Sequence, residues 1–294
     1  MVSKNILFTH IDLDGAGCAL LFKTFMQFEE VFYINHGLDN KVDKDIIKIL
    51  SKRQDLKQVN VFISDISPSL DETYKWLIKN CNTLKILDHH KTQEEFALKY
   101  AKNFIYSPAM CGTMLVKGYL QEAELYNELS NKFIKDWDYL TELINDNDLW
   151  LNEHVFSKDL DKLFSFLGLT RFVEIFTDRP FMLYRYNDII DILKEMEERY
   201  VEKAIQDKQQ CFYGDYVYAE RYKNEICNQL AEVNESGIGI AISMRSKNIS
   251  LRSREDVDVS KIAIANGGGG HKNAAGFLFD TLQELDSFLK TGQK

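Results

Sequence analysis

LKILDHH, residues 84–90, is the stretch that decides the fold of this chain. An apolar run, residues 84–87, ends abruptly in one carboxylate and two imidazoles. Such a run is typical of a buried strand, and ligands bind at the carboxyl ends of the strands in an open α/β sheet. The alternative is a turn whose aspartate caps the next helix and whose histidines face solvent. The triplet alone does not distinguish a ligand site from a solvated turn. The residues at the ends of the other expected strands are needed to decide.

A second expected strand ends in a similar group of side chains. Residues 5–8 are apolar, and His10, Asp12 and Asp14 follow on alternate positions. Side chains on alternate positions of an extended segment point the same way, so these three would converge. The loop has no GxxxxGK[ST] pattern and is therefore not a Walker A phosphate loop. A helix-capping loop with Asp14 as the cap would explain one acid but not the set, which we interpret as metal ligands.

A third expected strand, residues 59–63, is β-branched and aromatic and precedes Asp65. In a parallel sheet Asp65 would face the same crevice as the other two groups. It is therefore predicted to be a ligand rather than a structural turn residue. Ser67 or Ser69 is expected to cap the helix that begins near Pro68.

The alternation of strands and helices predicts an α/β fold, a parallel sheet with helices on both faces. Further strands are expected at residues 31–34 and 103–106, and His36, alone after the first of these, is interpreted as a loop residue or a support for a ligand. Carboxylates mixed with imidazole suit Mn²⁺, Fe²⁺ or Zn²⁺ better than Ca²⁺, which prefers oxygen ligands alone. The strand ends together supply these candidate ligands: His10, Asp12, Asp14, Asp65 and His89.

Composition limits the class of protein. A chain of 294 residues suits two domains, and 45% apolar with 28% charged residues is typical of a soluble globular protein. No stretch reaches the ~20 apolar residues of a membrane span and no signal-like N-terminus precedes the first strand, so a cytoplasmic protein is expected. Five scattered cysteines argue against disulfides and a zinc knuckle. A net charge of −9 disfavours long nucleic acid but leaves a short anionic substrate open.

The C-terminal part of the chain changes character. Residues 186–210 are strongly helical and are interpreted as a connector between domains, with a core helix of one large domain as the alternative. Strands are expected at residues 216–219, 237–244 and 249–252.

A run of four glycines, residues 267–270, then precedes His271 and Lys272. Such a run is costly in conformational entropy unless the backbone must approach something closely. A glycine-rich loop that opens onto a helix can hold a phosphate with its N–H groups. A flexible linker is disfavoured, because apolar residues flank the run and small residues, 274–276, follow it.

These motifs, in this order, resemble those of the DHH family of phosphoesterases, which is named after the triplet Asp88-His89-His90. The segment from His10 to Gly15, HIDLDG, is similar to the first motif of the family, and Asp65 to the second. Many members carry a further aspartate two positions after Asp14, where this chain has Ala16. The chain therefore resembles the branch that includes single-strand exonucleases.

The fourth motif of the family is an aspartate after a helical stretch. Two residues of this chain are candidates, and Asp148, which precedes Leu149-Trp150, is preferred over Asp146.

The resemblance also implies a mechanism. Two divalent cations, expected to be Mn²⁺, would activate a water for in-line attack on a phosphate ester. Asp65 would bridge the metals, His90 would contact the scissile phosphate or protonate the leaving oxygen, and Asp88 would orient an imidazole. The remaining metal ligands implied by the family are His10, Asp12, Asp14, His89 and Asp148.

The end of the chain resembles a second unit, the DHHA1 domain. Its signature, GGGHxxAAG, is matched by residues 268–276. The resemblance implies that this loop, with an Arg-Ser strand end, holds the far end of a nucleotide substrate. The residues concerned are Arg245, Ser246, Gly268, Gly269, Gly270 and His271.

The combined resemblance predicts a two-domain phosphodiesterase: a parallel-sheet DHH domain, residues 1–185, a helical linker, 186–210, and a smaller α/β DHHA1 domain, 211–294. The implied reaction is hydrolysis of short oligonucleotides (nanoRNA) and linear dinucleotides to nucleoside monophosphates, with neither long duplex nucleic acid nor a membrane as partner. The alternatives are a cyclic dinucleotide (c-di-AMP type) phosphodiesterase, a 3′-phosphoadenosine 5′-phosphate phosphatase and, from another class, a non-catalytic nucleotide-binding protein. A homodimer is left open.

Overall fold

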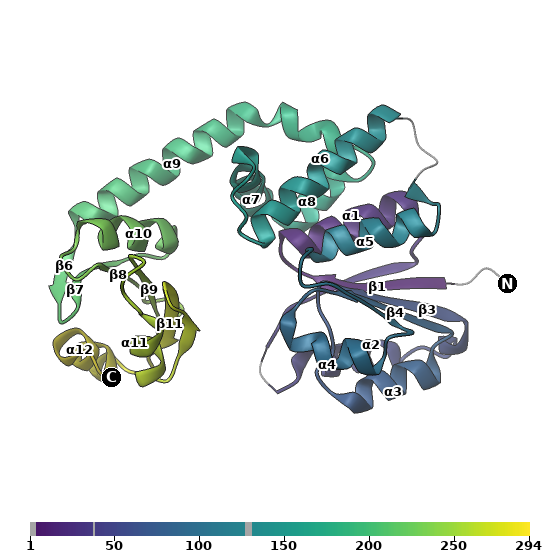
Figure 1. Cartoon of the computed structure of the whole chain (residues 1–294), viewed down its shortest axis with the longest axis horizontal. Coiled ribbons are helices and arrows are strands. Elements are labelled where there is room, and N and C mark those ends of the chain that lie inside the picture. Colours follow the sequence, from purple (N-terminus) through teal and green to yellow (C-terminus); the bar gives the residue numbers. More distant parts are fainter. Residues whose placement is uncertain (1–3, 38, 127–130) are drawn as a thin grey trace. The chain divides into compact units, whose positions relative to one another are not determined.

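The computed structural model describes residues 4–37, 39–126 and 131–294. Its contacts divide the chain into two compact units, Met1–Ile190 and Asp191–Lys294 (Figure 1). The first unit contains the residues predicted to bind metal, and the second contains those predicted to bind substrate. Each unit has a β-sheet of its own.

The first sheet is parallel throughout, as the sequence predicts, and its strand order is β2-β1-β3-β4-β5. Because β1 lies between β2 and β3, the strand order reverses there, which is where ligands bind in sheets of this kind. The strands are β1 (Lys4–His10), β2 (Glu30–Ile34), β3 (Val59–Ser64), β4 (Thr83–Asp88) and β5 (Phe104–Tyr106).

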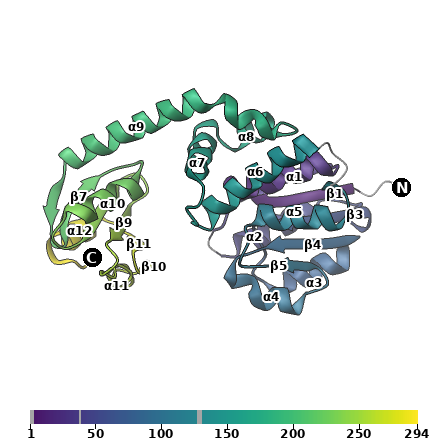
Figure 2. The ribbon, with the colours of Figure 1, turned by 45° about the horizontal axis from the view of Figure 1, so that its top comes forward.

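Helices cover both faces of this sheet because both faces are apolar. Alternate residues of β1 point to opposite faces, so Leu7 belongs to one core cluster and Ile6 and Phe8 belong to the other. The Ile6 face is covered by α2 (Lys41–Leu50), α3 (Asp71–Asn80) and α4 (Glu94–Lys99). The Leu7 face is covered by α1 (Leu13–Phe25) and α5 (Gly112–Glu122), and Figure 2 again places α3 and α4 opposite α1.

A layer of helices packs outside α1 and completes the first unit. Trp137, on α6, and Phe172, on α8, are buried in the same cluster as Phe22 of α1. The elements of this layer are α6 (Asn131–Asp148), α7 (Val155–Leu167), α8 (Leu169–Phe176) and the 3₁₀ helix η4 (Pro180–Arg185). The 3₁₀ turns η1 (Leu56–Gln58) and η2 (Lys91–Gln93) lie earlier in the chain. The stretch interpreted as a connector forms α9 (Asn187–Gln206).

The second unit is built on a mixed sheet with the order β10-β11-β9-β8-β7-β6. Only β7 and β8 pair in parallel, and the other neighbours are antiparallel. Ala241 of β8 packs with α10, whereas Ile240 and Ile242 pack with α11 and α12 on the opposite face. The elements are β6 (Gln209–Cys211), β7 (Gly214–Tyr218), α10 (Lys223–Val233), β8 (Ile238–Ser243), β9 (Asn248–Ser253), α11 (Ser260–Ala265), β10 (Gly269–His271), β11 (Ala274–Leu278) and α12 (Leu282–Thr291).

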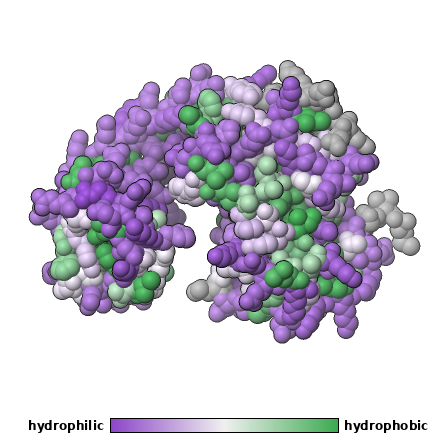
Figure 3. Space-filling view, in the orientation of Figure 1, coloured by the Kyte–Doolittle hydropathy of each residue, from purple (hydrophilic) through white to green (hydrophobic). Residues whose placement is uncertain are grey.

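Hydrophilic residues cover most of the visible surface of each unit, and smaller hydrophobic patches lie among them on both units (Figure 3). Within the described ranges, no helix has the length and apolarity that a membrane crossing requires. All five cysteines are free thiols, as predicted, and four of them are buried.

Candidate metal centre

Three neighbouring strands of the first sheet end in the predicted ligands. His10 is the last residue of β1, Asp65 directly follows β3, and His89 directly follows β4. Because β1, β3 and β4 are adjacent and parallel, their carboxyl ends lie at one edge of the sheet. Asp65 has a left-handed backbone, with φ 56°, which aspartate tolerates better than bulkier side chains. The predicted convergence of the strand ends is therefore present.

The segment after β1 differs in conformation from the prediction. His10, Asp12 and Asp14 do not lie on one extended stretch, because α1 begins at Leu13. Asp12, and not Asp14, is the N-cap of this helix, and its carboxylate accepts a hydrogen bond from the N–H of Gly15. The side chains still gather at the same place, since a tight turn joins the strand end to the first helical turn.

Asp14 is held by the beginning of another helix, α5. Its two carboxylate oxygens accept hydrogen bonds from the N–H groups of Gly112 (2.6 Å) and Thr113 (2.7 Å). The positive end of the helix dipole favours a carboxylate there. Residue 112 must be glycine, because a Cβ atom would lie 2.7 Å from Cβ of Asp65 and 2.9 Å from Oδ2 of Asp14.

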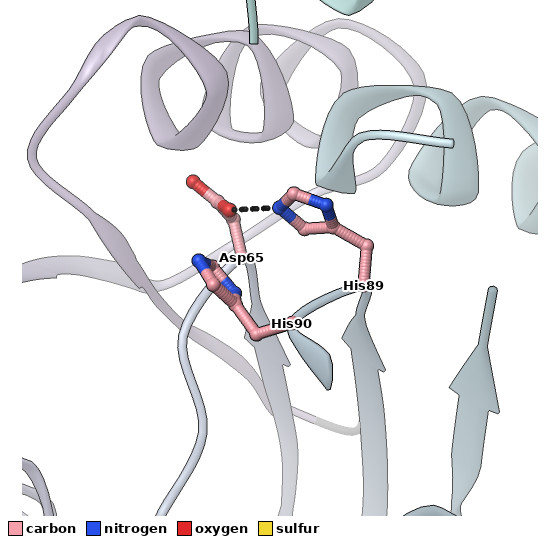
Figure 4. A group of neighbouring side chains, drawn as sticks. All are labelled: Asp65, His89 and His90. Atoms are coloured by element: carbon pink, nitrogen blue, oxygen red, sulfur yellow. Dashed lines mark ion pairs between the residues drawn. The ribbon is translucent and has the colours of Figure 1, made fainter. Parts of the chain in front are cut away.

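Asp65 lies in the middle of the cluster. Its Oδ1 is 3.3 Å from Nε2 of His89, and its Oδ2 is 3.9 Å from Nδ1 of His10. Figure 4 shows the His89 ring directed at the Asp65 carboxylate, with the His90 ring beside them. The same Nε2 atom of His89 is 3.5 Å from Oδ2 of Asp148 and 3.9 Å from Oδ2 of Asp14.

Among the described residues, three groups of donor atoms could each hold a metal ion, and in each group the atoms lie within 4.8 Å of one another. Asp65 and His89 each belong to two of them. The groups are Asp65 with His89 and His90, His10 with Asp12 and Asp65, and Asp14 with His89 and Asp148.

Several donor atoms at the centre of this cluster are buried and have no hydrogen-bond partner among the described residues. They are Oδ2 of Asp65, Nε2 of His89 and Oδ2 of Asp148. A buried polar atom without a partner is costly, and divalent cations bound in this cluster would supply partners for these atoms. The residues present therefore fit a metal centre.

The electrostatics of the cluster agree with this fit. Burial, together with the nearby carboxylates of Asp14 and Asp12, raises the pKa of Asp65 well above its usual value. The same causes, in the same order, raise the pKa of Asp148 to about 7. Burial also lowers the pKa of His89. The carboxylates thus resist ionisation together, and a cation would relieve their mutual repulsion.

Asp88 holds His90. The Asp88 side chain is 1% exposed, and its Oδ1 accepts hydrogen bonds from Nδ1 (2.7 Å) and the backbone N–H (3.0 Å) of His90. Burial opposes ionisation of Asp88, but the hydrogen bonds from His90 outweigh it and lower the Asp88 pKa. The same contact raises the pKa of His90.

Ser67 and Ser69 do not cap a helix, contrary to the prediction. Helix α3 begins at Asp71, and no side chain caps it. Ser67 donates instead to Oδ2 of Asp88 (2.5 Å), and the hydroxyl and N–H of Ser69 donate to Asp43 of α2. Both serines fix the loop that follows Asp65.

The two candidates for the fourth motif occupy different places. Asp148, the last residue of α6, faces His89, as described above. Asp146 is buried away from that cluster, and its Oδ1 accepts hydrogen bonds from the N–H groups of Glu153 (2.7 Å) and His154 (3.3 Å).

The predicted substrate-binding residues all lie in the second unit and are exposed. Arg245 and Ser246 lie in the turn between β8 and β9, where Glu220 accepts hydrogen bonds from the N–H groups of Met244 and Arg245. The glycine run does not open onto a helix, contrary to the prediction, because Gly269–His271 forms β10 of a hairpin with β11. The strand order places this hairpin next to β9, on the side away from β8.

His36 lies beside the predicted metal ligands. Its ring centroid is 4.9 Å from that of His10 and 5.8 Å from that of His90. It follows a strand of the same parallel sheet, as His10 and His89 do, and from the sequence it is interpreted as a loop residue or a support for a ligand. The rings that it contacts depend on the strand order, which the sequence alone does not give.

Comparison with known proteins places the chain among phosphodiesterases. A model of the DHHA1 domain matches residues 216–294. The chain is 30% identical to oligoribonuclease NrnB of Bacillus subtilis, over 95% of this chain and 74% of that protein. It is 28% identical to a 3′,5′-cyclic-nucleotide phosphodiesterase of Helicobacter pylori, over 48% of this chain and 42% of that protein.

A solved structure supports the fold. The pGpG-specific phosphodiesterase PggH of Vibrio cholerae aligns with a TM-score of 0.54 and 15% identity, over 96% of this chain and 95% of that one. At this level of identity the likeness concerns the fold alone.

Proposed function

The chain belongs to the DHH family of phosphoesterases and carries a C-terminal DHHA1 domain, and from this premise we propose that it hydrolyses short oligonucleotides and linear dinucleotides to nucleoside monophosphates. The name of one relative supports this substrate class, since the protein that is 30% identical over 95% of this chain is an oligoribonuclease. The reaction is hydrolysis of a phosphodiester bond.

One observation carries the proposal. Buried, unpaired donor atoms of Asp65, His89 and Asp148 converge at the carboxyl edge of the sheet, and Asp65 lies between donors on either side. We propose that two divalent cations occupy this cluster, with Asp65 between them. The ligands would be His10, Asp12, Asp14, Asp65, His89 and Asp148. The mixed oxygen and nitrogen donors suit Mn²⁺.

When bound, the cations would lower the pKa of a water and neutralise the charge of the phosphoryl group. The chain's own residues would do the rest. Because Asp88 is held in its ionised form, His90 donates to it from Nδ1 and keeps Nε2 free. The raised pKa of His90 favours its protonated form, so Nε2 can donate to the phosphate or to the leaving oxygen.

The second unit would hold the far end of the substrate. Arg245 supplies a positive charge and Ser246 a hydroxyl at an exposed turn. Gly268, Gly269, Gly270 and His271 present an exposed backbone with few side-chain atoms. These assignments, together with residues 1–185 as the catalytic domain, 186–210 as the linker and 211–294 as the substrate domain, form part of the proposal. The cytoplasmic location and the homodimer stay predictions.

A cyclic dinucleotide is the second candidate substrate. A relative that matches 48% of this chain is named a 3′,5′-cyclic-nucleotide phosphodiesterase, so hydrolysis of a cyclic phosphodiester occurs among similar proteins, although that name does not mention a dinucleotide. A 3′-phosphoadenosine 5′-phosphate phosphatase stays an alternative, since it would use the same donor atoms. A non-catalytic nucleotide-binding protein ranks lower, because it would not need the groups of donor atoms that could hold metal ions.

The test is hydrolysis by the purified, Mn²⁺-loaded protein of a linear dinucleotide, a cyclic dinucleotide and a long single strand, each with and without a chelator. Rapid conversion of the linear dinucleotide to mononucleotides, with the long strand spared, is expected. Equally fast cleavage of the cyclic dinucleotide would make it the preferred candidate substrate. Chelator-insensitive cleavage, or none, would contradict the proposal.

A further inference from the structure

His36 is the exposed member of a group of four imidazoles at the carboxyl edge of the first sheet. It lies two residues beyond the end of β2. Its ring contacts His10 from β1 on one side and His90 from the end of β4 on the other, at centroid distances of 4.9 Å and 5.8 Å. The rings of His89 and His90 are 4.4 Å apart. Residues far apart in the sequence thus form one continuous row.

His36 differs from its two neighbours in what its ring nitrogens contact. His10 and His90 each place Nδ1 against a carboxylate, Asp12 at 2.5 Å and Asp88 at 2.7 Å. Within residues 4–37, 39–126 and 131–294, neither nitrogen of His36 has a hydrogen-bond partner, and His36 belongs to none of the three candidate metal groups. The ring is therefore available to a molecule that enters the site.

A contact between the neighbouring residue Asn35 and His10, the last residue of β1, fixes the position of His36. The residue before it, Asn35, places its side-chain oxygen 3.2 Å from Nε2 of His10. This contact ties the segment after β2 to the metal centre and brings the His36 ring to the exposed rim. Hydrogen-bond donors at the rim of a site lined by carboxylates would favour the approach of a phosphate, which carries the same charge as those carboxylates.

We propose that His36 donates a hydrogen bond to a non-bridging oxygen of the scissile phosphodiester, beside His90. The inference rests on the proposed function, because it adds a phosphate-binding residue to that same site. Two imidazoles with centroids 5.8 Å apart can each donate a hydrogen bond of about 2.9 Å to one phosphate group. His36 is thereby a substrate-binding residue, distinct from the metal ligands.

The test compares the wild type with His36→Ala, His36→Gln and a control, His154→Ala, which removes a histidine from the loop between α6 and α7. Each Mn²⁺-loaded protein is assayed on a linear dinucleotide and on bis(p-nitrophenyl) phosphate, which shares only the phosphodiester. Hydrogen bonds to charged groups are worth enough that His36→Ala should lower kcat/KM about 10- to 100-fold on both substrates. His36→Gln, which keeps a neutral donor, should recover part of this loss, and His154→Ala should match the wild type.

Two further measurements separate this role from others. Mn²⁺ affinity should be unchanged in His36→Ala, and a fall would mean that His36 is a metal ligand. The affinity of the Mn²⁺-loaded protein for inorganic phosphate, measured by calorimetry, should fall about tenfold, and this readout needs no turnover. An inert wild type would reject the proposed function alone. Unweakened phosphate binding, or a loss of activity confined to the dinucleotide, would overturn the assignment of His36.

Discussion

The candidate metal centre of the first unit is made of buried and half-buried side chains, whereas the predicted substrate surface of the second unit is made of exposed backbone and one exposed turn. Asp65 and Asp14 are 1% and 2% exposed, but Arg245 and the residues from Gly267 to Lys272 are all exposed. Burial makes charge interactions strong and costly, so cations bound in the first region would stabilise it. Exposure makes each contact of the second region weak and easily reversed.

The two regions also use glycine differently. At Gly112 an added Cβ would meet the side chains of Asp65 and Asp14, so glycine there brings a helix against the ligands. At Gly268 an added Cβ would lie 2.2 Å from the carbonyl oxygen of Gly276, so glycine there lets two strands of the hairpin approach. At Gly269 nothing lies within 4 Å of the added atom. We interpret this open position as room for a ligand.

The largest expected effect is that of Asp65→Asn, which keeps the shape and the left-handed backbone but removes the charge. Turnover should fall more than 100-fold, since residues that merely orient metal ligands are already worth about 10- to 100-fold. The metal-free protein should become more stable, by about 2–4 °C in Tm, because an unpaired buried carboxylate is lost. Activity assays measure the loss of turnover, and thermal unfolding in the presence of a chelator measures the change in Tm. A lower Tm of the variant would contradict the view that the buried charge of Asp65 destabilises the metal-free protein.

Asp148→Ala and Asp146→Ala form the next comparison. Loss of Asp148 should reduce Mn²⁺ affinity and turnover about 10- to 100-fold without destabilising the metal-free protein. Loss of Asp146 should instead cost about 1–3 kcal/mol of stability, since two backbone N–H groups lose their acceptor. Urea unfolding measures the stability of each variant, and metal titration measures its Mn²⁺ affinity. A loss of Mn²⁺ affinity in Asp146→Ala, with Asp148→Ala unaffected, would make Asp146 the ligand.

Arg245→Ala should act on binding alone. We expect KM for a linear dinucleotide to rise about tenfold with kcat nearly unchanged, because one charged hydrogen bond to substrate is lost in the second unit. Lys261→Ala is the matched control, since that side chain is 81% exposed on the same unit and pairs with Asp258 at the surface. An equal fall of kcat would place Arg245 in the chemical step.

The smallest effect expected is a pH dependence of stability in the metal-free protein. The folded-state pKa values of Asp65 and Asp148 are raised, the latter to about 7, above an unfolded value of 3.8. Their protonation therefore stabilises the folded state fully below about pH 4, and this contribution is lost as the pH rises toward 7. Since Asp148 is partly exposed, we expect a fall of roughly 1–3 kcal/mol. Mn²⁺ should abolish it, and denaturant unfolding at several pH values measures both.

Much of the fold could be predicted because the signals are local. Short apolar runs that end in polar residues predict strands and their ends, and alternation with helices predicts a parallel sheet, which is confirmed. The errors concern how loops close. Ser67 precedes a helix and has the chemistry of a cap, but its hydroxyl bonds to Asp88, which is 21 residues away. Propensity cannot anticipate a partner that only the assembled sheet supplies.

The glycine run shows the same limit. Its composition indicates a close approach of the backbone, and the contacts of Gly268 agree with that. Whether a helix or a strand follows is decided by β9, which offers an edge for β11 to pair with. The predicted phosphate loop at a helix N-terminus is therefore a β-hairpin.

By itself the sequence determined the elements, their order and the chemical types at the strand ends, because periodicity and residue identity are properties of the chain. Only the tertiary structure decided which of these side chains meet. It placed Asp148 at His89, turned Asp146 to the backbone, paired Asp88 with His90 and brought His36 to the same edge. The physical reason is that adjacency across strands depends on strand order and register, which are set by packing of the whole sheet and which no single segment encodes.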